Sequence, residues 1–353
     1  MRLAFSPYEL KFRFPAGTSR GVLLHKKTYF LKYYDESQPG KPGYGEAAVF
    51  AGLSAEDGPQ YENKLIELSR NIRTGKPTDI KDFSSIIFGL EQAQADFLNG
   101  GKGVYFDSPF IRGEISIRIN GLIWMGNRNE MVKRVEKKIS EGYGCIKVKI
   151  GAIAWEDELY LLSLIRELTE DRNVDLRVDA NGAFDSENCM SRLKDLEKFR
   201  LHSIEQPVKP GQWDLLRKLC ENTPVPIALD EELIGINEDS KRLELLTYVR
   251  PRYIVLKPAL CYGFSGAASW IEAADKNGVG WWITSALESS VGLDAIAQFT
   301  ATKQIQMAQG LGTGNLYTNN FKSPLTLSGD KLRLTERTDI FQPKLETLEW
   351  KEY

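Results

Sequence analysis

The sequence predicts an α/β protein built around a barrel of parallel strands, with a smaller α+β domain before it. Charged residues end short apolar runs at steps of 25 to 30 residues, and helical patterns fill the intervals between those runs. One strand, one helix and two short loops need about that length in a βαβ repeat. The first part of the chain lacks this regular spacing of strands and helices, which indicates a separate domain.

The size and charge of the chain narrow its class. At 353 residues it exceeds what one hydrophobic core usually supports, so a large domain with a smaller one is expected. A net charge of −2 gives nucleic acid and anionic membranes no electrostatic attraction. We therefore expect a small-molecule partner; the sequence makes no prediction of the oligomeric state.

Cysteine and histidine usage predicts where the protein works. The four cysteines lie far apart without a C-x-x-C spacing, and with only two histidines a zinc site is not expected. Reduced thiols fit an intracellular protein. The first residues lack the apolar core of a signal peptide, and no apolar run is long enough for a membrane span. A cytoplasmic location is the prediction.

Residues 1–110 predict the small α+β domain. Its patterns alternate first at the period of strands and then at the period of helices. The expected elements are strands at 8–14, at 22–34 and ending near 46, followed by helices at 62–72 and 83–98.

Residues 111–324 predict the barrel, and residues 325–353 a tail of strands and loops that packs back on the first domain. The expected strands lie at 115–122, 146–150, 176–181, 202–207, 226–231, 253–258, 280–285 and 306–312. The expected helices lie at 130–139, 155–168, 186–199, 213–220, 239–246, 265–277 and 292–303. Eight parallel strands that close on themselves form a (β/α)8 barrel, here without its last helix.

Three acidic residues end neighbouring strands of this barrel. Asp179, Glu205 and Asp230 would meet at one mouth, where like charges repel strongly unless a cation binds them. A single acid after a strand is commonly no more than a helix N-cap, but three in register favour a metal site. Hard oxygen ligands without histidine or thiolate fit Mg²⁺, and Mn²⁺ as well.

Three lysines flank these acids. Lys147 and Lys149 alternate by two and so face the same side of their strand, while Lys257 ends a strand four further along. Burial and a neighbouring cation lower the pKa of a lysine, which prepares it as a base. A metal bound to a substrate carboxylate then lowers the cost of removing the adjacent proton. The predicted reaction is proton abstraction α to a carboxylate.

Five motifs in register resemble the enolase superfamily, in its muconate lactonizing enzyme subgroup. They are Lys147-x-Lys149, Asp179-x-Asn181, Glu205-Gln-Pro207, Asp230-Glu231 and Lys257-Pro258. The resemblance covers nearly the whole chain and implies an amino-terminal capping domain, a (β/α)7β barrel and a tail that completes the cap. It also implies a lysine base working with Mg²⁺ through an enediolate. Asn181 and Glu231, close behind metal ligands in sequence, are expected to orient those ligands or their waters.

Two loops resemble the o-succinylbenzoate synthase family within that subgroup. They are Ser285-Ala-Leu-Glu-Ser-Ser-Val-Gly292 and Gly310-Leu-Gly-Thr-Gly-Asn315. The resemblance implies dehydration of 2-succinyl-6-hydroxy-2,4-cyclohexadiene-1-carboxylate to 2-succinylbenzoate, in menaquinone biosynthesis. Lys149 would then be base and acid, Lys257 the cation that stabilises the enediolate, and Lys147 the electrostatic support of Lys149.

The same loops supply candidates for binding the succinyl carboxylate. Hydroxyl and backbone N–H groups are expected from Ser285, Ser289, Gly312 and Thr313. Loops of the cap at 16–20 and 49–53 are expected to close over the substrate.

Other functions share part of this pattern. Dipeptide epimerases and N-acylamino acid racemases of the subgroup share the metal site and the lysines. In dipeptide epimerases an Asp-x-Asp after the eighth strand holds the substrate ammonium, whereas residues 312–317 contain no acid. Muconate cycloisomerisation stays open, and a non-catalytic barrel would have no need of all six charged residues.

Overall fold

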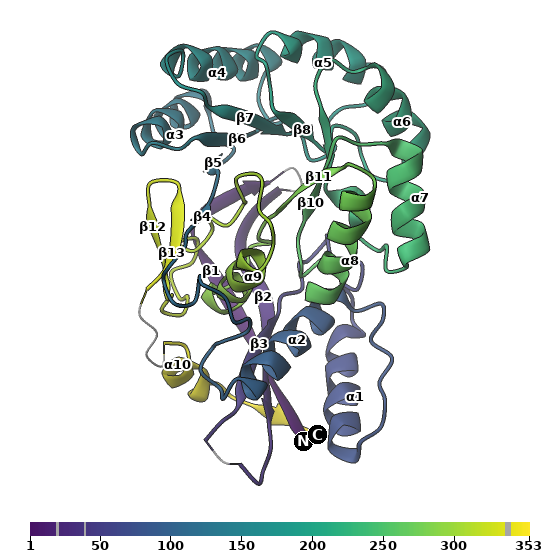
Figure 1. Ribbon diagram of the computed structural model, residues 1–353, viewed down its shortest axis with the longest axis vertical. Coiled ribbons are helices and arrows are strands. Elements are labelled where there is room, and N and C mark those ends of the chain that lie inside the picture. Colours follow the sequence, from purple (N-terminus) through teal and green to yellow (C-terminus); the bar gives the residue numbers. More distant parts are fainter. Residues whose placement is uncertain (19–20, 39, 336–339) are drawn as a thin grey trace.

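The cap is an antiparallel sheet covered by two helices. In the computed structural model, which describes residues 1–18, 21–38, 40–335 and 340–353, it lies at one end of a parallel barrel (Figure 1). The sheet has the order β14-β1-β2-β3. Its elements are β1 (Arg2–Thr18), β2 (Gly21–Tyr34), β3 (Gly43–Ala47) and β14 (Lys351–Glu352), with helices α1 (Tyr61–Thr74) and α2 (Ser84–Leu98).

Glycines bring β3 into direct contact with α2. A side chain at Gly45 would start 2.0 Å from the carbonyl oxygen of Gly89, and one at Gly43 would start 2.0 Å from the carbonyl oxygen of Ala93. Only glycine permits so close an approach of two backbones. Helix α2 therefore packs directly on β3, the edge strand of the cap sheet.

Seven parallel strands form the barrel sheet, in the order β11-β10-β9-β8-β7-β6-β5. They are β5 (Gly121–Ile123), β6 (Cys145–Lys149), β7 (Asp175–Asp179), β8 (Ser203–Glu205), β9 (Ile227–Leu229), β10 (Tyr253–Leu256) and β11 (Gly280–Ile283). The helices around them are α3 (Arg128–Ser140), α4 (Trp155–Leu168), α5 (Cys189–Glu197), α6 (Trp213–Asn222), α7 (Asp239–Val249), α8 (Gly263–Lys276) and α9 (Ser290–Ala301), with a 3₁₀ turn η1 (Glu231–Leu233) after β9. The predicted fold class, a TIM-like barrel with an amino-terminal cap, is confirmed.

The ring closes through a segment too short to form a regular strand. Gln309 makes a parallel bridge with Ile119, and Gly310 makes one with Thr284. The predicted eighth strand at 306–312 is thus reduced to isolated bridges that join both edges of the seven-stranded sheet. Closing the sheet in this way leaves its carboxyl-terminal ends around one mouth.

The predicted first strand, 115–122, is divided in two. Its first part, β4 (Ile117–Arg118), pairs with β13 (Lys331–Leu334), and the second part is β5 of the barrel. The backbone changes partners between the two: Ile119 N–H donates to Asp330 and Asn120 N–H to Gln309. A pattern of apolar residues does not reveal such a change, because Ile117 before it and Ile123 after it are both buried.

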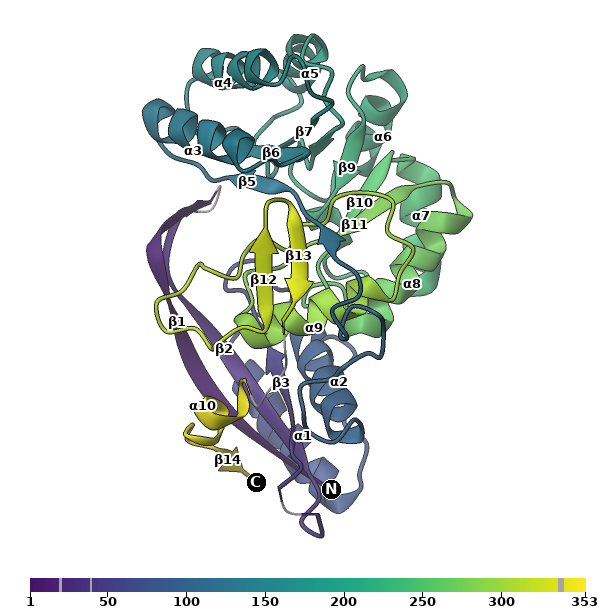
Figure 2. The ribbon, with the colours of Figure 1, turned by 60° about the vertical axis from the view of Figure 1, so that its left-hand side comes forward.

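The tail returns to the cap. The hairpin of β12 (Leu325–Ser328) and β13 adds to β4, and α10 (Gln342–Glu346) leads to β14, which pairs with β1. Figure 2 shows the tail beside the long β1–β2 hairpin, which extends along the barrel towards β5. The domain boundaries at 110 and 324 stay predictions.

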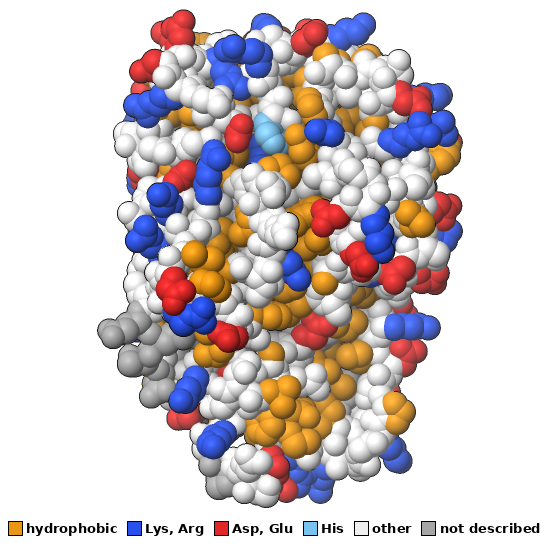
Figure 3. All heavy atoms as spheres, viewed as in Figure 1, with side chains coloured by type: hydrophobic (Ala, Val, Ile, Leu, Met, Phe, Trp, Pro, Cys, Tyr) orange, Lys and Arg blue, Asp and Glu red, His pale blue; other side chains and the backbone are white. Residues whose placement is uncertain are grey.

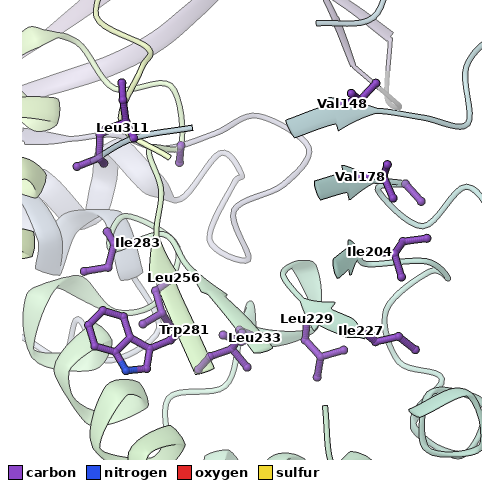
Figure 4. Close-up of a cluster of buried hydrophobic side chains, with 14 of the residues drawn as sticks. Val148, Val178, Ile204, Ile227, Leu229, Leu233, Leu256, Trp281, Ile283 and Leu311 are labelled. Atoms are coloured by element: carbon purple, nitrogen blue, oxygen red, sulfur yellow. The ribbon is translucent and has the colours of Figure 1, made fainter. Parts of the chain in front are cut away.

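Alternation along each barrel strand separates the core from the site. Val148, Val178 and Ile204 belong to the large hydrophobic cluster that packs against the helices (Figure 4). The residues between and after them point to the barrel interior, where the charges lie. The apolar contacts outside the ring therefore fix the positions of polar groups inside it.

Carboxylates of the cap bind the first turns of two barrel helices. Glu46 of β3 accepts hydrogen bonds from the backbone N–H groups of Ser289 and Gly292 at the start of α9. Glu91 of α2 accepts from the N–H group of Phe264 at the start of α8. Such carboxylates satisfy unpaired N–H groups and favour the positive end of the helix dipole. The cap is thereby held over the loops that follow β10 and β11.

Within the described residues, no helix has the length and apolar character needed to cross a membrane. On the face drawn in Figure 3, lysine and arginine side chains are interspersed with acidic ones, in agreement with the small net charge.

A partly buried histidine at the amino-terminal end of the barrel predicts the response to acid. His202 stacks on Tyr253 with ring centroids 4.7 Å apart. Burial lowers the pKa of His202 to about 4, and the charge of Arg177 acts in the same direction. Because the unfolded chain binds this proton more readily, the stability contributed by neutral His202 is present above about pH 6.5 and lost as the pH falls towards 4.

We expect His202→Asn to lose less stability than the wild type when the pH is lowered from about 7 to about 5. The free energy of unfolding, measured by urea titration at several pH values, checks this. Parallel losses in the two proteins would contradict it.

Candidate active site

The sheet register brings the predicted charges together at the mouth of the barrel. Asp179 is the last residue of β7 and stands in register between Lys149 of β6 and Glu205 of β8. Asp230 follows β9 directly, and Lys257 follows β10. The three carboxylates are almost completely buried. This placement agrees with the prediction that the three carboxylates and the lysines lie at the same mouth of the barrel.

Each carboxylate lies against a lysine. Lys147 Nζ lies 2.6 Å from Glu205 and 3.0 Å from Asp179 Oδ2. Lys149 Nζ lies 3.0 Å from the same Asp179 oxygen, and Lys257 Nζ binds Asp230 Oδ2. The six charges come from the ends of β6, β7 and β8 and from the first residues after β9 and β10. Four of them form one network of contacts, and Lys257 with Asp230 forms a pair beside it.

The network shifts the titration of its carboxylates. Burial acts to raise the pKa of Asp179, but Lys147 and Lys149 outweigh it and hold that pKa well below its usual range. Burial raises the pKa of Glu205 well above its ordinary value, and the negative charge of Asp179 adds to this. Glu205 therefore experiences the repulsion that converging acids create.

Two of the lysines have shifted pKa values. The pKa of Lys147 is raised, because Asp179 and Glu205 outweigh the lowering effect of burial. The pKa of Lys257 is raised too, by Asp230 and Glu231 against the effect of burial. Both side chains are firmly cationic in these surroundings.

The donor set at this point fits a hard divalent cation. Three buried carboxylates from adjacent strand ends offer oxygen ligands, without sulfur or imidazole. In the described part of the chain, no three acidic, histidine or cysteine side chains are gathered as a ready cage, because lysine ammonium groups lie between the carboxylates. Glu205 and Asp179 already share one cation, Lys147, which shows that positive charge is bound between them.

Left-handed turns place the polar residues behind the carboxylates. Asn181 has a φ of 44°, and its side chain accepts from Lys149 Nζ at 2.6 Å and donates to Glu231 Oε1 at 3.0 Å. Gln206, with a φ of 38°, accepts at Oε1 from the backbone N–H of Asp230 at 3.1 Å. The side chain of Asn181 thus joins Lys149 to Glu231, and the expected role of Asn181 and Glu231 in orienting metal ligands stays a prediction. Gln206 lies within the Glu205-Gln-Pro207 motif, yet no role for it was predicted from the sequence.

A cavity opens beside the charged network. Its floor includes Lys147, Lys149, Asp179 and Lys257. Carboxylates among its lining residues are confined to this end, at Asp179 and Glu231. Of the three candidate metal ligands, Asp179 lines the cavity, whereas Glu205 and Asp230 are buried and are not among the lining residues.

The other walls are apolar or carry neutral polar groups. Phe50 and Leu53 reach in from the cap, as the expectation for the loop at 49–53 requires, and Trp124 and Leu287 add further apolar surface. The expectation for the loop at 16–20 concerns residues 19–20 and side chains that lie outside the described part. Asn120 also lines the cavity, although it was not predicted as a site residue; its position within the first predicted barrel strand is the signal that could have indicated it.

Three of the four candidates for carboxylate binding line the cavity, and the fourth does not. Ser285, Gly312 and Thr313 line the cavity. Ser289 is a buried N-cap of α9, whose hydroxyl donates to Glu46 at 2.6 Å and accepts from the Val291 N–H group. This corrects its expected place: Ser289 joins the barrel to the cap and is not among the residues that line the cavity.

Comparison with known proteins identifies relatives of the whole chain. Residues 130–338 match the family described as enolase C-terminal domain-like. An o-succinylbenzoate synthase of Desulfotalea psychrophila is 44% identical, over 94% of this chain and 98% of that protein. The crystal structure of MenC from Desulfotalea psychrophila LSv54 has a TM-score of 0.84 at 40% identity, covering 95% of this chain and 99% of that one. A hydrophobic dipeptide epimerase of a Flavobacteria bacterium is 26% identical over 85% of this chain and 86% of that protein.

The buried charge network predicts what happens when one cation is removed. Lys147→Met leaves Asp179 and Glu205 facing each other without an ammonium group between them. In the presence of a chelator we expect its free energy of unfolding to fall by about 3 to 5 kcal/mol. Lys137→Met, the same change at an exposed helix position, is the control and should stay within about 0.5 kcal/mol of the wild type. Urea titration measures both; equal effects would contradict the network.

Proposed function

The chain belongs to the enolase superfamily, and we propose that it acts there as an o-succinylbenzoate synthase. The observation that carries this function is the near full-length match to the synthase of Desulfotalea psychrophila. The function predicted from the two loops is confirmed by that match, while the dipeptide epimerase alternative has only a distant relative in its favour. The reaction is the loss of water from 2-succinyl-6-hydroxy-2,4-cyclohexadiene-1-carboxylate to give 2-succinylbenzoate.

Asp179, Glu205 and Asp230 are the residues that would hold the divalent metal ion. Enzymes of this superfamily bind such an ion, typically Mg²⁺, and Mn²⁺ has the same preference for oxygen ligands. When bound, the ion stabilises the negative charge that develops on the substrate carboxylate as the α proton leaves. Asn181 and Glu231 hold their neighbours in place for this role, since Asn181 bonds both Lys149 and Glu231.

Lys149 is our candidate for the proton transfers. It lines the cavity, and Asp179 and Asn181 fix its ammonium group. Its neutral form takes the α proton as the carbon–hydrogen bond breaks. The same proton then goes to the departing hydroxyl as the carbon–oxygen bond breaks, so that water leaves and the ring becomes aromatic. One group on one face of the ring serves both steps, which gives a syn elimination.

Lys257 and Lys147 keep their charges in this scheme. Lys257 faces the cavity from β10, on the other side of the carboxylates, where a cation stabilises the enediolate. Lys147 lies deeper and contacts the same Asp179 oxygen as Lys149. On this contact we assign Lys147 the electrostatic support of Lys149. Their raised pKa values agree with cationic roles.

The lining of the cavity favours a substrate without an ammonium group. A dipeptide or free amino group needs a carboxylate partner away from the metal, and the far wall offers Ser285, Gly312 and Thr313 instead. On this basis we propose a carbon–oxygen lyase acting on a small dicarboxylate; the absence of a nucleic acid or membrane partner stays a prediction. The cytoplasmic location stays a prediction.

Turnover and isotope exchange test this function. Purified protein with Mg²⁺ is incubated in D₂O with the cyclohexadiene substrate and, separately, with N-succinyl amino acids and dipeptides. We expect dehydration of the cyclohexadiene, and we expect Lys149→Ala to lose at least about 10² to 10⁴ in kcat because the positioned base is gone.

The matched control is Lys194→Ala, at a basic position in the last turn of α5 outside the cavity. Exchange with dipeptides alone would contradict the synthase function. Full turnover by Lys149→Ala with an unchanged fold would contradict the assignment of the base.

A further inference from the structure

A chain of hydrogen bonds runs from the cavity wall into the seam between barrel and cap. Thr313 Oγ1 lies 2.9 Å from Ser285 Oγ, and Ser285 Oγ lies 2.6 Å from Glu288 Oε2. Thr313 and Ser285 line the cavity, whereas Glu288 is completely buried behind them. The Leu287 N–H group also donates to Ser285 Oγ, at 2.9 Å. The single hydroxyl proton of Ser285 can therefore be donated either to Glu288 or to Thr313.

The protonation of Glu288 decides the direction. If Glu288 is ionised it is an acceptor only, so Ser285 donates to it and Thr313 donates to Ser285. Both hydroxyl protons then point away from the cavity, which leaves lone pairs facing any ligand. If Glu288 carries a proton, it donates to Ser285, Ser285 donates to Thr313, and the Thr313 proton is directed into the cavity.

The surroundings of Glu288 make either state accessible. The charged and titratable groups that act on it are Lys26 of β2, Glu46 of β3 and Tyr317, which follows the eighth-strand segment. Glu46 is bonded to Thr28, Ser289 and the start of α9. Within the described residues, neither Lys26 Nζ nor Glu288 Oε1 has a hydrogen-bond partner, although both atoms are buried.

We propose that Glu288 takes up a proton when the second carboxylate of the ligand binds, so that the Thr313–Ser285–Glu288 chain donates a hydrogen bond to that carboxylate. The inference rests on the proposed function, which supplies a ligand with two carboxylates. The proton comes from solvent, and only hydroxyl rotations follow it. Glu288 does not touch the ligand and is a positioning residue that acts through Thr313.

Charge and burial support this direction. Burial raises the pKa of Glu288; Glu46 raises it further, while Lys26 and Ser285 oppose the rise. A ligand carboxylate at Thr313 adds another negative charge near Glu288, which favours the neutral acid. If Glu288 were ionised, the hydroxyl groups of Ser285 and Thr313 would present lone pairs to the ligand carboxylate, which is an unfavourable arrangement.

Proton uptake during ligand binding tests the proposal. The Mg²⁺-loaded protein is titrated calorimetrically with 2-succinylbenzoate and with 2-butanoylbenzoate, which has a methyl group in place of the second carboxylate. Each titration is run in two buffers with different enthalpies of ionisation. We expect greater proton uptake with the succinyl compound, by up to one proton per site, because only this compound protonates Glu288. Proton changes at the metal end are common to both ligands and cancel in the comparison.

Variants separate positioning from structure. Glu288→Gln keeps the shape and can donate to Ser285 without a proton from solvent, so the excess uptake should vanish while the preference for the succinyl compound stays within about threefold of wild type. Ser285→Ala interrupts the chain and should reduce that preference about tenfold. Lys26→Met removes the charge that favours ionised Glu288, so we expect less excess uptake with the preference retained.

Lys27→Met, the same substitution at the next, exposed position of β2, is the control and should behave as wild type. Equal uptake with both ligands, or a Glu288→Gln variant as poor as Ser285→Ala, would overturn the proposal. The second result would mean that ionised Glu288 is needed only to balance Lys26. A wild-type protein that binds neither compound would instead contradict the proposed function.

Discussion

Electrostatic repulsion among three buried carboxylates is the constraint on which this structure depends. Asp179, Glu205 and Asp230 cannot converge at the mouth of the barrel unless positive charge lies between them. The chain supplies three ammonium groups at once, one against each acid or bridging two of them. The arrangement makes the mouth a place where cations bind strongly, and a divalent ion has the same requirement for hard oxygen ligands.

The cap gives this mouth its shape. Glu46 and Glu91 reach from the cap to the first turns of α9 and α8, so the loops before those helices are held from both sides. Phe50 and Leu53 enter the cavity from the same domain. The fold therefore separates two roles. The strand ends of the barrel carry the charged residues for chemistry, and the seam with the cap carries the Thr313–Ser285–Glu288 chain, which distinguishes one carboxylate ligand from another.

The sequence predicted most of the charged site because a parallel barrel converts spacing along the chain into proximity. Asp179 and Glu205 are 26 residues apart in sequence and yet stand in register on neighbouring strands. It failed where a contact joins elements with no common spacing. Ser289 was expected in the cavity because its loop lines it, but the long-range contact with Glu46 could not be seen from either segment.

Backbone geometry was equally hidden. The left-handed turn at Gln206 aims its side chain at the backbone of Asp230, and no residue pattern specifies that turn. The first barrel strand was read as continuous, although its backbone changes partners at Ile119. The raised pKa of Lys147 follows from distances of 2.6 and 3.0 Å to its acids, which a sequence cannot supply.

The most direct test of the account is an anomalous diffraction experiment on crystals grown with Mn²⁺. The account predicts one strong Mn²⁺ peak at Asp179, Glu205 and Asp230, with the ammonium group of Lys147 moved from between the first two. A peak elsewhere, or Lys147 still bridging those two carboxylates with no ion present at saturating Mn²⁺, would contradict it.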